Sequence, residues 1–61
     1  MTSPIIKYFE YGHLPARLAE VSAQMASVAH WAEEMIPDGP EKSAGLRKLL
    51  EAKDCLVRAA L

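Results

Sequence analysis

The chain has 61 residues and a formal net charge of −1, with 25% of its residues charged. This balance argues against a general DNA- or RNA-binding protein, which would carry a surplus of lysine and arginine. Cys55 is the one cysteine, so no disulfide forms within these residues, and the two histidines lack the paired spacing of a structural zinc site. A chain of this length buries only about 60% of its unfolded surface. We therefore expect it to be stabilised by homo-oligomerisation.

The first 14 residues form an aromatic-rich lead-in. Only two consecutive apolar residues precede Lys7, unlike a secretory signal, and no apolar run approaches the roughly 20 residues of a membrane span. The lone thiol of Cys55 is consistent with a reducing compartment. We expect a cytoplasmic protein with no membrane contact.

Two helices are predicted after the lead-in, over residues 15–36 and 40–61. Pro15 suits a first helical turn, and the next proline or glycine occurs only in the PDGP sequence at 37–40. Asp38 is expected to accept a hydrogen bond from the free N–H groups of the second helix, with Pro40 in its opening turn. So short a connection predicts an antiparallel hairpin. The expected fold is all-α, one helical hairpin domain over residues 1–61 that assembles into a helical homo-oligomer.

Apolar residues recur at helical spacing in both segments and predict how they pack. The stripe on the first helix comprises Leu18, Val21, Met25, Val28, Ala29, Ala32 and Ile36. Its expected partners on the second helix are Leu46, Leu49, Leu50, Leu56 and Val57.

A second face of the first helix carries small residues, among them Ala19, Ser22, Ala23 and Ala26. This face either meets water or forms a subunit contact through Ala19 and Ala26. Trp31 lies off the main stripe, and aromatic residues are enriched at interfaces. We expect Trp31 to be covered by a partner subunit or by the lead-in.

Charged residues of the second helix are expected to share a solvent-exposed face, and Lys53 is the exception. The i, i+4 spacing predicts ion pairs between Arg47 and Glu51 and between Asp54 and Arg58. Lys53 instead lies near the middle of the apolar side. Its ammonium either reaches the rim of that side or meets an anion, for which a phosphate in a subunit interface is a natural choice. Arg47, Lys48 and Arg58 are near enough along the helix to join such a site.

Catalysis is poorly supported by these residues. A nucleophile needs a base within reach, and neither Cys55, His13 nor His30 has an acid or base partner evident from the sequence. Glycine-rich phosphate loops and nucleophile elbows are also missing from the sequence. We expect a non-enzymatic protein without a cofactor.

The lead-in favours binding, because Tyr8, Phe9 and Tyr11 occur beside Lys7 and His13. Such a segment can fold back as a hydrophobic lid. It can also be a stacking platform, since nucleobases stack on flat rings and phosphates attract cations. The two interpretations coexist if Phe9 is buried while the tyrosines are presented to a ligand.

Two stretches, FEYGHLP at 9–15 and GPEKSAGLRKLLEAKDCLVRAAL at 39–61, resemble a known family. It comprises the small phage proteins that share an anti-CBASS/anti-Thoeris hairpin domain. The resemblance implies a sponge that sequesters cyclic oligonucleotide immune signals in pockets between the subunits of a helical oligomer, often a hexamer. It also implies a location in the cytoplasm of the host bacterium.

The same resemblance assigns roles to individual residues. Tyr11 stands where the family has a base-stacking tyrosine, and Arg58 is in register with the arginine of its C-terminal run. The family also uses a lysine midway along the first helix, but this chain has no lysine or arginine between Leu18 and Ile36. Its phosphate contacts are therefore expected from Lys53, Lys48, Arg47 or the lead-in.

Two functions are favoured by the sequence, and a third class, a small metal or redox protein, would rest on Cys55 and the two histidines alone. The first is a sponge for cyclic di- or trinucleotides, with Tyr8 or Tyr11 stacking on bases and Lys53 and Arg58 neutralising phosphates. The second is a helical oligomerisation or interaction module that inhibits or scaffolds a protein partner, for which Trp31 and the alanine-rich face matter most.

Overall fold

The computed structural model describes residues 4–10, 12 and 14–61, and in these ranges it contains helices and connections but no strand. A short 3-10 helix, η1 (Pro4–Phe9), precedes two long helices, α1 (Ala16–Met35) and α2 (Pro40–Ala60). The predicted all-α hairpin is confirmed. Each long helix agrees with its predicted range to within one residue at either end.

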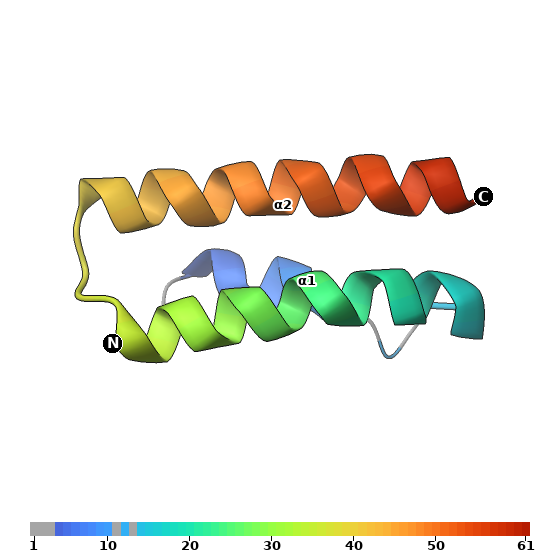
Figure 1. The fold of residues 1–61 in the computed structure, drawn as a ribbon, viewed down its shortest axis with the longest axis horizontal. Helices are drawn as coiled ribbons and strands as arrows, with labels where there is room; N and C mark the ends of the chain where they lie inside the picture. Colours follow the sequence, from blue (N-terminus) through green and yellow to red (C-terminus); the bar gives the residue numbers. More distant parts are fainter. Residues whose placement is uncertain (1–3, 11, 13) are drawn as a thin grey trace.

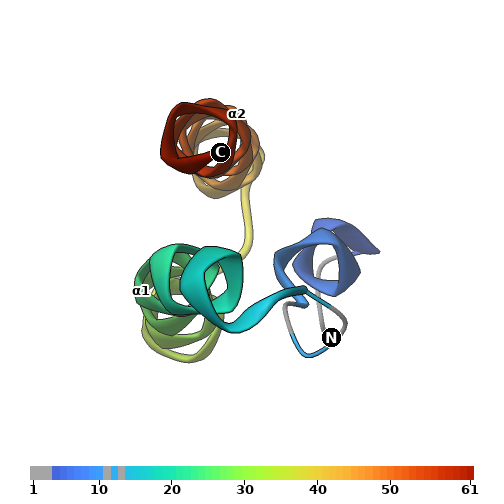
Figure 2. The same ribbon diagram turned by 90° about the vertical axis from the view of Figure 1, so that its right-hand side faces the viewer.

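The three helices are arranged so that only one side of the hairpin is covered. α1 and α2 lie side by side and run in opposite directions (Figure 1). η1 runs in the same direction as α2 and contacts both long helices from one side (Figure 2). On the opposite side, no described segment lies over the two helices.

α1 is limited by prolines at both ends. Pro15 is the residue that flanks the helix rather than the first residue within it, and its carbonyl accepts a hydrogen bond from the Ala19 N–H at 2.8 Å. Ile36 leaves the helix in an extended conformation. Pro37 explains this ending, because a proline disfavours helical geometry in the residue before it.

α2 begins differently from the prediction. Pro40 does occupy its first turn, but Gly39 flanks the helix and no side chain accepts a hydrogen bond there. The Asp38 carboxylate, expected to accept from the free N–H groups, instead accepts a hydrogen bond from the Lys42 ammonium at 2.9 Å. A full positive charge one turn into α2 competes successfully for this carboxylate.

The core lies between η1 and the two long helices. Phe9, at 1% exposure, is its largest fully buried side chain, and it clusters with Ala26, Ala29 and Leu46. The partly buried hydrophobic residues packed against this cluster are Ile5, Ile6, Met25, Ala32, Leu49 and Leu50. Phe9 therefore makes the lead-in a hydrophobic lid over the hairpin, which is one of the two roles predicted for this segment.

The core face of α1 is rotated relative to the predicted stripe. Val28 remains 45% exposed and Ile36 is also exposed, whereas Ser22 and Ala26 from the small-residue face are buried. Because the ring of Phe9 occupies this core, the adjoining helix surface must carry small side chains. Ala26, predicted at a subunit contact, is a core residue of the single chain.

None of the helices formed by the described residues is long and apolar enough to cross a bilayer.

Candidate functional site

The exposed part of η1 presents an aromatic ring beside a cation. Tyr8 is 56% exposed, and the Lys7 ammonium lies 5.2 Å from the centre of its ring. Residues three apart eclipse one another in a 3-10 helix, so Tyr8 shares a face with Ile5. Tyr11 and His13, the other predicted ligand residues of the lead-in, lie outside the described residues.

A small cleft separates η1 from the first half of α2. It encloses about 170 Å³ and is lined by Pro4 and Ile5 on one side and by Ser43 and Arg47 on the other. Arg47 is exposed, and the ion pair with Glu51 predicted for it is not formed. The cleft therefore combines a free guanidinium with the face of η1 that also carries Tyr8.

Lys53 lies on the packed side of α2, and its own neighbour satisfies its charge. The side chain is 14% exposed, and its ammonium is 2.8 Å from Oδ1 of Asp54. The apolar stem is thus largely covered while the ammonium meets a half-exposed carboxylate. The anion is therefore one from the chain itself, and a phosphate there stays a prediction. A phosphate at this position would have to compete with Asp54.

The remaining predicted cations of α2 point in different directions. Arg58 donates a hydrogen bond to the Cys55 sulfur at 3.4 Å, so its predicted pair with Asp54 is replaced as well. Lys48 is exposed. At about 100° per residue, Lys48, Lys53 and Arg58 lie on three separate sides of α2, and a single chain does not bring them together.

The three residues of α1 that were predicted to form a subunit contact differ in their exposure. Ala19 is half-buried, and Ala26 belongs to the core. Trp31 is 58% exposed, so the described lead-in does not cover it. Coverage by a partner subunit stays a prediction.

One cation network went unnoticed in the sequence. The Lys42 ammonium is 2.9 Å from Oδ1 of Asp38, 3.1 Å from the Glu33 carbonyl oxygen and 3.6 Å from Oε2 of Glu33. The carbonyls of a last helical turn lack partners within their own helix. Lys42 of α2 supplies one for α1 and ties the two helices together at their connection. The i, i+4 spacing of Asp38 and Lys42 could have predicted this ion pair from the sequence.

The charges of this network shift one another's protonation equilibria. The hydrogen bond from Lys42, together with its positive charge, lowers the pKa of Asp38 from the ordinary 3.8. The hydrogen bond to Asp38 raises the pKa of Lys42 above 10.5, against the opposing effect of burial, and the charges of Asp38 and Glu33 add to the increase. Both groups are therefore charged across the physiological range.

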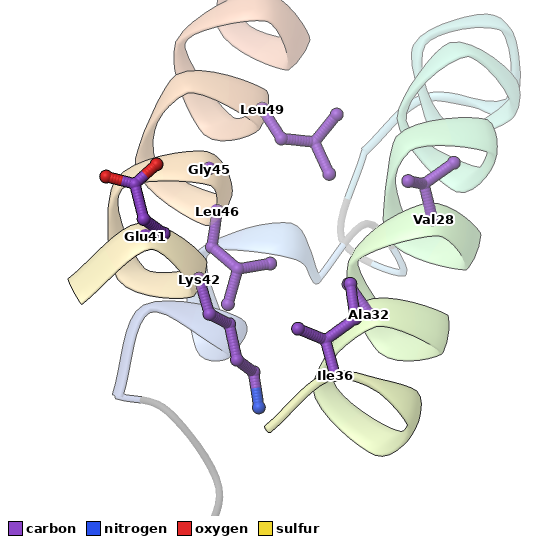
Figure 3. Close-up of a pocket in the computed structure, with 8 residues that line it drawn as sticks. All are labelled: Val28, Ala32, Ile36, Glu41, Lys42, Gly45, Leu46 and Leu49. Atoms are coloured by element: carbon purple, nitrogen blue, oxygen red, sulfur yellow. The ribbon is translucent and has the colours of Figure 1, made fainter. Parts of the chain in front are cut away.

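An open apolar groove lies between the long helices, next to their connection. Its volume is about 360 Å³, and the residues that line it are Val28, Ala32, Ile36, Glu41, Lys42, Gly45, Leu46 and Leu49. Figure 3 shows the apolar side chains of α1 pointing toward those of α2, with Lys42 at one end. Val28 and Ile36 were predicted to be core residues, but here they form the wall of a groove.

Comparisons with known proteins found no matching family model, no matching curated protein and no matching solved structure. The candidate site is therefore described from the geometry of this chain alone. On the η1 side, the chain offers an exposed ring with a lysine ammonium over it, and a small cleft that Arg47 lines. On the opposite side, it offers an apolar groove.

Proposed function

We propose that this chain is a non-enzymatic homo-oligomer that sequesters cyclic di- or trinucleotides in pockets between its subunits. Its role would be that of a phage anti-defence sponge for CBASS- or Thoeris-type signals in the cytoplasm of the host bacterium. The observation that carries the proposal is the exposed ring of Tyr8, with a lysine ammonium over it, on the same short helix as Pro4 and Ile5, which line the Arg47 cleft.

The chemistry of Tyr8 and Lys7 suits a nucleotide base. Every base has a π-face that stacks on a tyrosine ring, and such stacking is worth about 1–3 kcal/mol per base. The Lys7 ammonium lies over one face of the ring, 5.2 Å from its centre, so a base would stack on the other face with a positive charge nearby. Tyr11 would provide the second ring, following the family resemblance.

Arg47 is the best candidate for a phosphate contact among the described cations. It lines the cleft beside η1 and forms no ion pair there. Its planar guanidinium can hold two phosphate oxygens at once. Lys53 and Arg58 would contribute only after release from Asp54 and Cys55, and Lys48 would contribute from another direction.

The size of the cleft supports a pocket shared between subunits. Ligand pockets typically enclose about 300–1,000 Å³, whereas the cleft between η1 and α2 encloses about 170 Å³. A cyclic dinucleotide would need further walls. A neighbouring subunit is the simplest source of them.

Two measurements test nucleotide binding directly. Heat denaturation of the purified protein, followed by mass spectrometry of the supernatant, should reveal a cyclic oligonucleotide retained from the expression host. Calorimetry with a panel of cyclic di- and trinucleotides should then give a saturable signal, with the matching linear dinucleotide as a control. No heat from any cyclic member of the panel would refute the proposal.

Variants of the described residues locate the site. Tyr8→Ala should weaken binding by about 10- to 100-fold through the lost stack, while Tyr8→Phe should bind as the parent does. Arg47→Ala should lose a similar factor with the charged contact. Arg17→Ala, which removes an exposed arginine from the first turn of α1, is the matched control and should leave binding unchanged.

The apolar groove favours a second candidate, a module that binds and inhibits or scaffolds a protein partner. Such a module would rely on the groove and on Trp31, and it would be indifferent to Tyr8→Ala. A chain whose biological effect is abolished by Trp31→Ala but not by Tyr8→Ala would therefore favour this function.

A further inference from the structure

The uncovered side of α2 carries an apolar stripe with a regular spacing. Its members are Gly45, Leu49, Ala52, Leu56 and Ala59. They are spaced by four, three, four and three residues, which is the heptad pattern that keeps one seam of a helix facing another helix. All except half-buried Leu49 are exposed in the single chain.

The stripe is continuous with the apolar surface of α1. Gly45 and Leu49 line the groove together with Val28 and Ile36. Trp31 and Met35 extend this surface along α1, and both are more than half exposed. The side away from η1 is therefore apolar along α2 and over the last two turns of α1, with Glu41 and Lys42 also lining the groove. Arg47 and Ser43 mark the opposite side, which η1 contacts.

The packing of the single chain does not explain this side. A Cβ atom at Gly45 would meet nothing within 4 Å, although glycine within a helix costs about 1 kcal/mol relative to alanine. A glycine at this open helical position, in spite of that cost, indicates a surface that another molecule approaches closely.

We propose that a second copy of this chain covers it, with the two α2 helices packed antiparallel along their stripes. Gly45 of one copy lies opposite Leu56 of the other, and Leu49 lies opposite Ala52. Each of the four layers between Gly45 and Leu56 then joins one leucine to one small residue, which suits close packing of the seam, while Ala59 lies opposite Lys42 at either end.

The stripe itself argues for a second copy as the occupant. Small and large residues alternate along it, and an antiparallel copy presents the complementary sequence of sizes in the four layers between Gly45 and Leu56. A standard interface buries about 800 Å² per partner, less than a fifth of this chain's 4428 Å². Sliding the pair by one heptad would bring the two Lys53 residues together, which favours the stated register.

Cysteine cross-linking tests the register. The arrangement brings Lys48 of one copy beside Cys55 of the other, at the edge of the seam. Within one helix these positions are about 10.5 Å apart, too far for a disulfide, so only a dimer can link them. Lys48→Cys should therefore give a covalent dimer upon oxidation, with the 48–55 link identified by peptide mapping.

Arg47→Cys is the matched control, because it is adjacent in sequence but lies on the η1 side of α2. It should give little 47–55 link under the same conditions. Equal yields from the two variants, or no 48–55 link, would overturn the proposed register.

A charge in the stripe tests the interface without cysteine chemistry. Leu56→Lys should raise the dissociation constant of the dimer by at least about 30-fold, as expected for a central contact, when measured by sedimentation equilibrium. The helix content should persist in circular dichroism, because Leu56 is 48% exposed in the single chain. Ala44→Lys, on an exposed face away from the stripe, should leave the dissociation constant unchanged.

The inference rests on the assembly part of the proposed function and not on nucleotide binding. A monomeric parent chain that binds a cyclic dinucleotide would overturn this dimer and leave binding in place. A dimer that forms the 48–55 link but binds no nucleotide would support the interface and refute nucleotide binding.

Discussion

On the side of the hairpin that η1 contacts, Phe9 is fully buried and clusters with Ala26 and Ala29. On the opposite side, Val28 and Leu56 are 45% and 48% exposed, and an apolar groove separates the helices. The chain thus completes one half of its core with its own lead-in. Small residues on α1 suit the covered side, whereas large exposed residues and a glycine on the uncovered side suit another chain.

Removing Phe9 should have the largest effect. Phe9→Ala is expected to lower the free energy of unfolding by about 3–5 kcal/mol, because it deletes a fully buried ring and leaves a cavity. Urea unfolding followed by circular dichroism measures the change. Val28→Ala on the uncovered side is the control and should cost less than half as much; equal losses would contradict the contrast between the two sides.

Ser22 offers a gain on the covered side. Its hydroxyl oxygen is buried and has no hydrogen-bond partner among the residues that the structure describes, so Ser22→Ala should raise the free energy of unfolding by about 1–2 kcal/mol. Ser27→Ala, at an exposed position of the same helix, should gain only the propensity difference of about 0.5 kcal/mol. Thermal and urea unfolding of both variants provide the test, and a loss on Ser22→Ala would reveal an unrecognised partner for the hydroxyl.

Gly45 provides a smaller gain on the uncovered side. Gly45→Ala should raise the free energy of unfolding by about 0.8–1 kcal/mol, since the new methyl group meets nothing in the chain and alanine favours the helix. The unfolding of Gly45→Ala and of the parent chain should be compared at protein concentrations below the dissociation constant of the proposed dimer, so that only the single chain is measured. A destabilisation there would mean that Gly45 is required by the single chain.

The Asp38–Lys42 pair should produce the smallest effect, visible as a pH dependence. The lowered pKa of Asp38 contributes stability that is complete above 3.8 and is lost as the pH falls through its folded value. The raised pKa of Lys42 contributes stability that is complete below 10.5 and is lost as the pH rises through its folded value.

Melting temperatures from pH 2 to 12 can separate the two contributions. Asp38→Asn should flatten the acidic part of the curve, while Glu51→Gln, which removes an exposed carboxylate from α2, should leave its shape unchanged. An unaltered acidic part in Asp38→Asn would exclude the pair as its cause.

The two long helices were predictable because local signals determine them, whereas the 3-10 helix η1 was not predicted. Pro15 and the PDGP sequence delimit both long helices. Phe9 was foreseen as a lid residue because the lead-in concentrates aromatic side chains beside an incomplete hairpin. These signals act over a few residues and need no knowledge of the packing.

The rotation of α1 and the ion pairs were not predictable in the same way. A periodic pattern weights large apolar residues, but the volume of the Phe9 ring makes Ser22 and Ala26 the better core residues. Helical spacing allows several partners for each charge. Asp54, the predicted partner of Arg58, forms its ion pair with Lys53 instead. Lys42 of α2 donates a hydrogen bond to the Glu33 carbonyl oxygen of α1.

Trp31 has a practical consequence. It is the single tryptophan of the chain and is 58% exposed on the uncovered side, in line with Val28 and Met35. Indole fluorescence shifts toward shorter wavelengths when water around the ring is replaced by apolar groups. The protein therefore carries an intrinsic optical reporter, and its emission upon dilution should reveal when a neighbour leaves that surface, without any label.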